Sequence, residues 1–592
     1  MKTVVHVTHE AVQKIGGIGA VLHGLLTSKS YAAAVQRDIL LGPLFTTDGP
    51  ADSRLAGGEV LYSSIDGIVN HPYGPKFAEI ERTYGVSLVY GRKVFFDKLT
   101  GVKSTPEVIL IDVRHFDPAK MGVFKFMLFK DYGIESQRYE HVWDYEQYCR
   151  IAMPGLDALH AIGACVGNTP VILSHEYMGM PTALCARSMH KGQFRSIFYA
   201  HEVATMRRLV EDHPGHDTMF YNVLEKAHQE KLDVDDVFGS QSFFYKHPLV
   251  EASRYCDNIF AVGDYVVKEL RFLNEAFETH PIDIAYNGVP ASKLTVAEKL
   301  ASRGRLQQYC ENLLGYTPDY VMTHVTRLVP SKGMWRDLRV MEQFERICRK
   351  ENKTAVLLVL STETLGRRTA DVLNMEANYK WPVAHREGYP DLTGGEAAYY
   401  SGVQEFNAKS RNCKVVYINQ FGFDRKTGGN RMPADMEFLD IRKGSDAEFG
   451  QSIYEPFGIA QIEPISFGGI CIFTNVCGCA GFVRHVTKGQ PTPNVIEADY
   501  TNLAGLPKVT EIEDLLKIDK PKRDFVESGV AKHVAEELFK RLPTNEAQIA
   551  KLIDAGYELA KNMSWEVVAR DYVLPGIERA LAKPAVHETT RV

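Results

Sequence analysis

Two cationic side chains stand close together after one of the apolar segments in the second half of the chain. Residues 326–333 place Arg327 and Lys332 five positions apart across a turn. Arginine presents a planar fork of donors and lysine a compact charge, so the two heads can bind a single diphosphate. The alternative interpretation is a pair of solvated surface cations in a loop.

A glycine-rich segment follows the first apolar stretch of the chain. In residues 13–19, Lys14 precedes Gly16 and Gly17, and an apolar, helix-like stretch comes next. Glycines at a strand-to-helix turn allow backbone amides to approach a phosphate, and the helix N-terminus adds partial positive charge. The spacing is not the GxGxxG of dinucleotide-binding proteins. A simple tight turn is the structural alternative.

Two carboxylates, Glu455 and Glu463, lie in an otherwise apolar segment with seven residues between them. If the first lies in a loop and the second about one turn into the following helix, both can accept hydrogen bonds from sugar hydroxyls. Glutamates on helices are more often simply solvated. Here the apolar neighbours favour a function, because a carboxylate in such surroundings needs a partner.

Two histidines, His175 and His201, each follow a short apolar run directly. Ligands of open α/β sheets bind outside the carboxyl ends of the strands, which is where both imidazoles are expected. A lone histidine is more often structural. Two at equivalent strand ends favour a functional role, and His201 is the better candidate.

These candidates need strands that end at a common edge, and the chain has a pattern of that kind. Short apolar runs alternate with longer amphipathic stretches, which is typical of parallel α/β sheets covered by helices on both faces. The length of 592 residues suits two doubly wound domains. The clearest predicted strands are Val4–Thr8, Val171–Ser174, Ile197–Ala200, Ile259–Val262, Tyr320–Thr326, Ala355–Leu360, Val415–Ile418 and Ile470–Thr474.

A turn-type cluster at residues 287–290 predicts the domain boundary. The N-terminal domain is predicted at 1–287 and the C-terminal domain at 288–564. We expect residues 363–411 to form a helical insertion on the second domain. Residues 565–592 are predicted as a C-terminal helix that crosses back to the first domain.

Composition excludes several classes of protein. A net charge of -6 and a pI near 6.4 provide no basic footprint for nucleic acid or an anionic membrane. The ten cysteines lack the CxxC spacing of a zinc site and indicate a reduced, cytoplasmic protein without a metal. The amino terminus does not resemble a signal peptide, and no run of about 18 apolar residues predicts a membrane span.

Further blocks of sequence resemble the glycogen synthases, above all the animal and fungal type, with features of the bacterial starch and glycogen synthases. The Arg327 and Lys332 pair and the segment 454–463 are shared more widely, across retaining GT-B glycosyltransferases. The blocks that carry the closer resemblance are 9–18 with Val21 and Leu22, 39–45, 220–224 and 286–289.

The resemblance implies a GT-B fold, in which two Rossmann-like domains face a central cleft and the second domain holds most of the nucleotide. It implies catalytic roles for His201, Glu455, Arg327 and Lys332. His175, selected from its place after an apolar run, is expected in the acceptor site or elsewhere in the cleft. The donor-binding residues that the resemblance implies are Lys14, Gly16, Gly17, Arg327, Lys332, Pro456, Phe457, Gly458, Glu463 and Thr474. Two departures from the family pattern are Pro464, directly after Glu463, and the sequence of residues 475–479.

The resulting hypothesis is a retaining glucosyltransferase that moves glucose from UDP-glucose or ADP-glucose to the 4-hydroxyl of an α-1,4-glucan such as glycogen. No cofactor is expected, and a homo-oligomer is left open. One alternative is a sucrose- or trehalose-type transferase with a small sugar or sugar-phosphate acceptor. A nicotinamide dehydrogenase shares the architecture but is disfavoured by the missing GxGxxG, and an inactive glycan-binding scaffold is the non-enzyme alternative.

Overall fold

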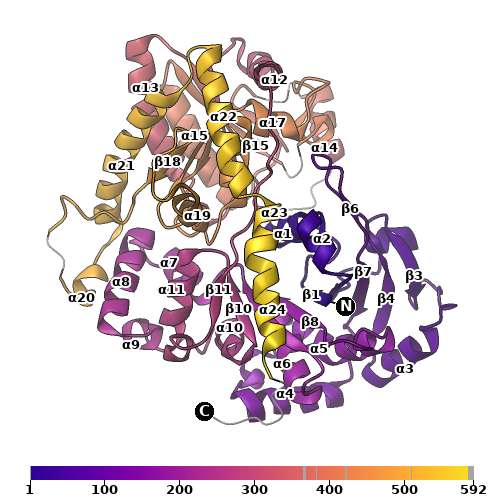
Figure 1. Ribbon diagram of the computed structural model, residues 1–592. Coiled ribbons are helices and arrows are strands. Elements are labelled where there is room, and N and C mark those ends of the chain that lie inside the picture. The colour runs from indigo at the N-terminus through magenta and orange to yellow at the C-terminus, as the bar shows by residue number, and fades with distance from the viewer. Residues whose placement is uncertain are drawn as a thin grey trace. The chain divides into compact units, whose positions relative to one another are not determined.

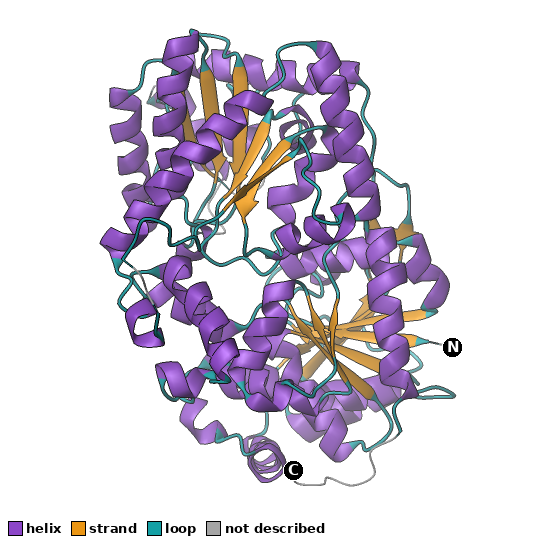
Figure 2. Ribbon diagram, turned by 60° about the vertical axis from the view of Figure 1, so that its left-hand side comes forward, coloured by secondary structure: helices purple, strands orange, loops and turns teal. Residues whose placement is uncertain are grey.

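The computed structural model describes residues 2–364, 369–379, 381, 383–420, 423–507 and 510–584. The chain forms two compact units, each built on one large sheet between helices (Figures 1 and 2). Unit 1 comprises Met1–Met206, Ala227–Gly288 and Trp565–Val592, and unit 2 comprises Arg207–Lys226 and Val289–Ser564. The chain therefore changes unit within two helices, α7 (Ala204–Asp212) and α8 (His216–Glu230), which the sequence had assigned to the first domain.

Unit 1 contains a nine-stranded sheet in the order β11-β10-β9-β8-β1-β2-β7-β4-β3. The strands from β11 to β7 are parallel, and β4 pairs antiparallel with both β7 and β3. The bounds are β1 (Thr3–Val7), β2 (Arg37–Pro43), β3 (Glu59–Ser63), β4 (Ser87–Arg92), β7 (Glu107–Asp112), β8 (Val171–His175), β9 (Arg195–Ala200), β10 (Asn258–Ala261) and β11 (Ile282–Ile284). Strands β1, β8, β9 and β10 are buried along their whole length, as a sheet covered on both faces requires.

The helices of unit 1 include its C-terminal segment, which returns after unit 2. Trp565 packs where only glycine fits, because a Cβ on Gly24 or Gly288 would come within 2.1 or 2.6 Å of its ring. The helices are α1 (Gly17–Leu26), α2 (Lys29–Ala34), α3 (Gly74–Tyr84), α4 (Pro118–Tyr132), α5 (Trp143–Ala161), α6 (Glu176–Met189), α9 (Val234–Phe238), α10 (His247–Glu251), α11 (Asp264–Leu273), α23 (Trp565–Val568) and α24 (Leu574–Ala582).

Unit 2 contains a seven-stranded, wholly parallel sheet in the order β14-β15-β13-β12-β16-β17-β18. Successive residues of its central strands face two separate hydrophobic cores: Leu357 and Val359 belong to one, and Val356 and Leu358 to the other. The bounds are β12 (Tyr320–Val325), β13 (Ala355–Leu360), β14 (Arg386–Gly388), β15 (Cys413–Asn419), β16 (Ala447–Gly450), β17 (Ile470–Thr474) and β18 (Val495–Ala498).

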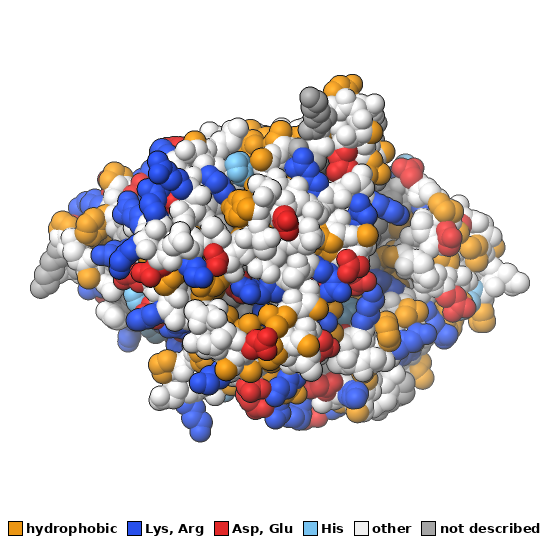
Figure 3. All heavy atoms as spheres, turned by 90° about the horizontal axis from the view of Figure 1, so that it is seen from above, with side chains coloured by type: hydrophobic (Ala, Val, Ile, Leu, Met, Phe, Trp, Pro, Cys, Tyr) orange, Lys and Arg blue, Asp and Glu red, His pale blue; other side chains and the backbone are white. Residues whose placement is uncertain are grey.

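On the face drawn in Figure 3, basic and acidic side chains are interspersed. The helices of unit 2 alternate with its strands along the sequence. They are α12 (Val296–Leu314), α13 (Trp335–Glu351), α14 (Thr369–Asn378), α15 (Gly394–Lys409), α16 (Arg425–Gly428), α17 (Phe438–Gly444), α18 (Ile459–Ile462), α19 (Gly478–Thr487), α20 (Ile512–Leu515), α21 (Lys520–Arg541) and α22 (Glu546–Asn562).

The predicted α/β class with two doubly wound sheets is confirmed, and all eight predicted strands are present. The prediction for residues 363–411 was wrong in one respect. Arg386–Gly388 is not part of a helical insertion but an edge strand, β14, paired in register with β15. Three residues are too short a run for period-two patterning to be recognised.

Candidate functional site

The loop after β12 holds the two predicted diphosphate cations in different environments. Residues Pro330–Lys332 form a short 3-10 turn that ends at Gly333, whose φ of 57° is left-handed. Lys332 forms an ion pair with Glu455 and is largely covered. The Arg327 side chain is exposed and has no hydrogen bond or ion pair within the described part of the chain. One cation is thus held in place, while the other is available to a ligand.

The loop after β16 fixes Glu455. Besides the Lys332 ammonium, its carboxylate accepts hydrogen bonds from Ser452 Oγ at 3.4 Å and Gln461 Nε2 at 3.2 Å. The left-handed Gly458, with φ 91°, lets the chain turn here, and a Cβ on it would lie 2.5 Å from Gln461 Oε1. That amide oxygen is buried and unpaired among the described residues, so it is an acceptor that sequence reasoning missed.

Glu463 ends up outside the helix that the sequence predicted. Helix α18 stops at Ile462, and a 3-10 helix, Glu463–Phe467, begins with Pro464 in its first turn. A proline is compatible with a first turn because the missing N–H has no helical acceptor there. The Glu463 carboxylate lies 3.1 Å from Nε of Arg442, a buried side chain that also pairs with Glu448 at 3.0 Å. Arg442 was not selected from the sequence, since only the fold shows its partner.

Thr474 is the last residue of β17 and is fully buried, with Oγ1 unpaired in the described structure. The chain then enters α19, whose N-terminus can attract an anion. The backbone N–H of Cys479 in α19 donates to the Phe457 carbonyl at 2.9 Å, which links α19 to the loop of Glu455. Strands β12, β16 and β17 are neighbours in the sheet, so the loops at their carboxyl ends belong to one edge.

The glycine loop of unit 1 differs from the prediction. The amides of Ile15, Gly16 and Gly19 donate to Glu10 Oε2 at 2.9, 2.8 and 2.9 Å. The protein's own carboxylate therefore takes the position expected for a phosphate, and a ligand could bind the Gly16 amide only by displacing it. The Lys14 side chain is exposed and forms no hydrogen bond or ion pair with the described residues, so its role stays a prediction.

His175 is not available to a substrate. Its side chain is fully buried, Nε2 lies 3.0 Å from His6 Nδ1, and Nδ1 lies 2.8 Å from His201 Nε2. Both ring nitrogens are used within unit 1, so the expected acceptor contact is corrected to a supporting position. His201 is partly exposed, and its Nδ1 has no hydrogen bond with the described residues.

Glu176, the residue after His175, is a second feature that the sequence did not indicate. It adopts a left-handed φ of 61°, which is costly for a glutamate, and accepts the Glu202 amide at 2.6 Å. Burial, reinforced by the charge of Glu202, raises the pKa of Glu176 well above its usual value. Strain and a buried carboxyl at a strand end are typical of functional sites.

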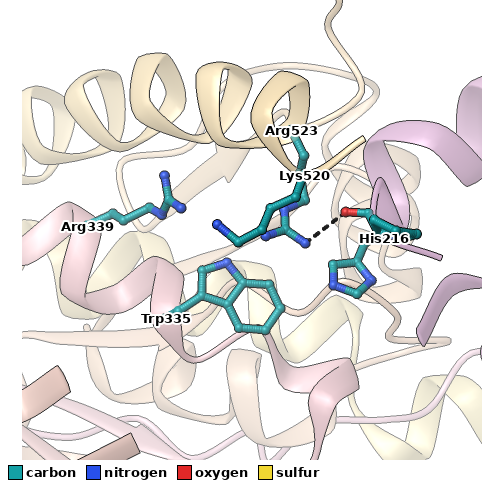
Figure 4. Close-up of a pocket in the computed structure, with 6 residues that line it drawn as sticks. His216, Trp335, Arg339, Lys520 and Arg523 are labelled. Atoms are coloured by element: carbon teal, nitrogen blue, oxygen red, sulfur yellow. Dashed lines mark hydrogen bonds between the residues drawn. The ribbon is translucent and has the colours of Figure 1, made fainter. Parts of the chain in front are cut away.

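A separate cavity of about 480 Å³ lies within unit 2 (Figure 4). Arg339 and Arg523 point toward it beside the Trp335 ring, and Arg523 donates to the Pro214 carbonyl at 3.0 Å. These arginines also pair with Asp524, at 2.7 and 3.2 Å. No residue selected from the sequence lines this cavity.

The described residues include no helix that is both long and apolar enough to cross a membrane. They also include no group of three or more His, Cys, Asp or Glu side chains arranged to hold a metal ion.

Comparisons with known proteins bear on the fold. No protein-family model matches the chain, and no curated protein matches it. The catalytic domain of starch synthase IV from Arabidopsis thaliana, bound to ADP and acarbose, superimposes with a TM-score of 0.52 at 14% identity, covering 98% of this chain and 99% of that one. An E. coli trehalose-6-phosphate structure bound with UDP-2-fluoro glucose gives 0.50 at 11% identity, covering 98% and 100%.

The N-terminal domain of Candida albicans trehalose-6-phosphate phosphatase is similar to the same degree, with a TM-score of 0.50 at 12% identity and coverages of 98% and 97%. Together with the two parallel α/β sheets, these similarities define the class of fold as GT-B, built from two Rossmann-like units. The predicted fold class is thus confirmed, while the identities are too low to carry a substrate over.

Proposed function

We propose that the chain is a retaining glucosyltransferase that takes glucose from a nucleoside diphosphate glucose. The observation that carries this proposal is the common sheet edge of unit 2, where the loops after β12, β16 and β17 bring Lys332, Glu455 and the start of α19 together. Two similar folds, bound to ADP with acarbose and to UDP-2-fluoro glucose, support a nucleotide-sugar donor.

In this proposal the donor diphosphate binds at the cationic loop. Negative charge grows on the leaving diphosphate during transfer, and fixed positive groups stabilise it most when they are already in place. Lys332 is already held by Glu455, while exposed Arg327 closes on the phosphates when the donor binds. The N-terminus of α19 adds partial positive charge from the backbone.

Glu455 and Glu463 then have separate tasks. Glu455, with its carboxylate already hydrogen-bonded by Ser452 and Gln461, faces the hydroxyls of the transferred glucose, with the backbone of Pro456, Phe457 and Gly458 beside it. Glu463, oriented by Arg442, accepts from the ribose hydroxyls.

Two residues of unit 1 are also assigned in the proposal. Lys14 is assigned to phosphate binding, and His201 accepts from or donates to a sugar hydroxyl. The departing phosphate takes the proton of the attacking acceptor on the same face, so the anomeric configuration is retained without a covalent protein intermediate.

For the acceptor we propose the non-reducing end of an α-1,4-glucan. The sequence resemblance to glycogen synthases and the starch synthase IV fold support this choice. The similar E. coli and Candida albicans trehalose-6-phosphate structures keep a small sugar-phosphate acceptor as the second candidate.

A donor-by-acceptor matrix tests both parts of the proposal. UDP-glucose and ADP-glucose are each offered with glycogen, glucose 6-phosphate and fructose 6-phosphate, and release of nucleoside diphosphate is measured. We expect release with glycogen and an α-linked product by proton NMR. If nucleoside diphosphate is released only with a sugar phosphate, the proposed acceptor is a sugar phosphate and not a glucan. If no pair supports turnover, the protein is an inactive binding protein.

Arg327→Ala is the sharpest variant for the donor site, because it removes an exposed charge that supports no other contact in the described chain. Loss of a charged hydrogen bond in the transition state is worth about 1.5–3 kcal/mol, so turnover should fall more than about tenfold. Arg346→Ala is the control, since the Arg346 side chain is exposed on α13 and its hydrogen bond among the described residues is to Gln343, at 3.1 Å. Equal rates for the two variants would refute the role of Arg327.

A further inference from the structure

Three histidines of unit 1 belong to one continuous hydrogen-bonded chain that begins at Asp38. Tyr31 Oη donates to Asp38 Oδ1 at 3.0 Å and lies 3.0 Å from His6 Nε2. His6 Nδ1 lies 3.0 Å from His175 Nε2, and His175 Nδ1 lies 2.8 Å from His201 Nε2. The chain therefore crosses the sheet from β2 through β1 and β8 to the end of β9, where His201 is partly exposed.

The three imidazoles of this hydrogen-bonded series, those of His6, His175 and His201, are neutral at ordinary pH. Tyr31, His6 and His175 are fully buried. Burial lowers the pKa of His6 to about 3 and that of His175 well below its usual value. Burial, with the nearby ring of His9, also lowers the pKa of His201 to about 3. A neutral imidazole has one N–H and one bare nitrogen, so each ring can donate on one side only.

The carboxylate at the start of the chain settles the direction of every later bond. An ionised carboxylate only accepts, so Tyr31 must donate to Asp38, and its oxygen is left to accept from His6 Nε2–H. His6 Nδ1 is then bare and accepts from the Nε2–H of His175. His175 Nδ1 is bare in turn and accepts from the Nε2–H of His201. The outer nitrogen of His201, Nδ1, must be a bare acceptor.

We propose that Asp38, Tyr31 and His6 are positioning residues that fix the tautomer of His201, so that it presents a bare Nδ1 to a hydroxyl of the bound sugar. This assignment deepens the proposed function and rests on it for the identity of the sugar. The chain of donors and acceptors itself does not depend on that function.

The rings of His175 and His201 are also packed against each other and against Tyr199. His175 and His201 are parallel within 6° with centroids 5.1 Å apart, and Tyr199 packs against both at 5.3 and 4.4 Å. A ring flip of His201 would put a carbon where Nε2 lies and so break its bond to His175. The tautomer must therefore be set by the hydrogen bonds and not by a change of orientation.

The titratable groups placed against Asp38 are Tyr31 from α2, at 3.0 Å, and His6 from β1, at 3.9 Å. Burial raises the pKa of Asp38 to about 7, and the hydrogen bond from Tyr31 opposes this change. The carboxyl is ionised at about pH 8.5, which is therefore the condition for the test.

The test observes the tautomers directly, by nitrogen-15 NMR of the full chain labelled in histidine, at about pH 8.5. His6, His175 and His201 are assigned from the signals lost in the single His→Gln variants. We expect all three to be protonated at Nε2 in the wild type. An Nδ1–H tautomer at His201 in the wild type would overturn the proposal without any variant.

Tyr31→Phe removes the acceptor for His6 Nε2–H and leaves a buried N–H unpaired unless the chain reverses. We expect His6, His175 and His201 all to switch to Nδ1–H. Asp38→Leu is the second variant, because Tyr31 is then free to donate to His6 and drive the same reversal. A His201 tautomer unchanged in both variants would contradict the proposal.

Tyr84→Phe is the matched control. Tyr84 Oη also donates to an aspartate, Asp157, at 2.7 Å within unit 1, but it has no bond to the histidines. We expect Tyr31→Phe to lower kcat/KM for the donor about tenfold or more, because the hydroxyl partner then faces a donor instead of an acceptor. Tyr84→Phe should leave both the rate and the tautomers unchanged.

The two proposals fail in different ways. If no donor or acceptor supports turnover but the tautomers switch as expected, the proposed function falls and the chain of positioning residues stands. If turnover is found but both Tyr31→Phe and Asp38→Leu leave His201 protonated at Nε2, the positioning role falls and the proposed function stands.

Discussion

The two units bury polar networks of opposite character. In unit 2 the Arg336 guanidinium pairs with Asp217 at 2.6 Å and Glu527 at 2.8 Å, and all three side chains are fully buried. In unit 1 the chain from Tyr31 through His6 to His175 is equally buried but carries no charge. A charged network must keep every partner, because a lone buried ion is very unfavourable. A neutral network tolerates loss of a member more readily, but it has a direction that can be reversed.

The largest expected effect is the loss of the charged network. Arg336→Met leaves Asp217 and Glu527 buried without their common partner, and should lower the free energy of unfolding by about 3–5 kcal/mol. Urea denaturation followed by circular dichroism measures this difference. Arg346→Met, exposed on the same helix α13 and hydrogen-bonded to Gln343, is the control and should change it by less than about 1 kcal/mol. Similar losses in both variants would remove the contrast between the networks.

The next effect concerns the acid at the start of the neutral network. The folded-state pKa of Asp38 is about 7, against 3.8 for an ordinary aspartate, because burial disfavours its charge. A raised pKa contributes stability that is present below pH 3.8 and is lost as pH rises through about 7. From about pH 5 to about pH 8 the wild type should therefore lose about 2–3 kcal/mol of unfolding free energy from this group.

Asp38→Asn isolates that titration, since the amide does not ionise. The difference in unfolding free energy between Asp38→Asn and wild type should move in favour of the variant as pH rises over this range. A difference that stays constant with pH would show that Asp38 does not titrate as the buried group expected here.

Lys332→Ala examines the donor edge of unit 2. It removes a cation of the proposed diphosphate site and leaves the Glu455 carboxylate without its ion pair. Turnover should fall by about tenfold to a hundredfold, or about 1.5–3 kcal/mol. Lys350→Ala, whose side chain is 83% exposed on the same unit, provides the matched loss of charge. A wild-type rate for Lys332→Ala would exclude the loop from catalysis.

The smallest expected effect lies at the glycine loop of unit 1. Glu10→Gln keeps the shape of the side chain but removes the charge that accepts the Ile15, Gly16 and Gly19 amides at the start of α1. We expect a loss of about 1 kcal/mol in unfolding free energy, as for a helix N-terminus deprived of its anion. Thermal unfolding measures it, and an unchanged midpoint would mean that the carboxylate is merely tolerated there.

Local sequence patterns indicated some features of the candidate site and missed others. Apolar periodicity located His201 and Thr474 at or near strand ends, because strands of a covered parallel sheet are continuous apolar runs. Pro464 was noted only as a departure from the family pattern, and the fold places it in the first turn of a new 3-10 helix. Glu10 was not recognised as the occupant of the glycine loop, because its competition with a phosphate depends on backbone geometry.

The amino-acid sequence by itself determined the two doubly wound sheets and the strand ends from which candidate side chains project, since both follow from local apolar patterning. Only the tertiary structure decided the partners: Lys332 with Glu455, Arg442 with Glu463, and His6 with His175. Lys332 and Glu455 are 123 positions apart and His6 and His175 are 169 apart, so their pairing depends on strand order, which is a property of the packed sheet that no local pattern contains.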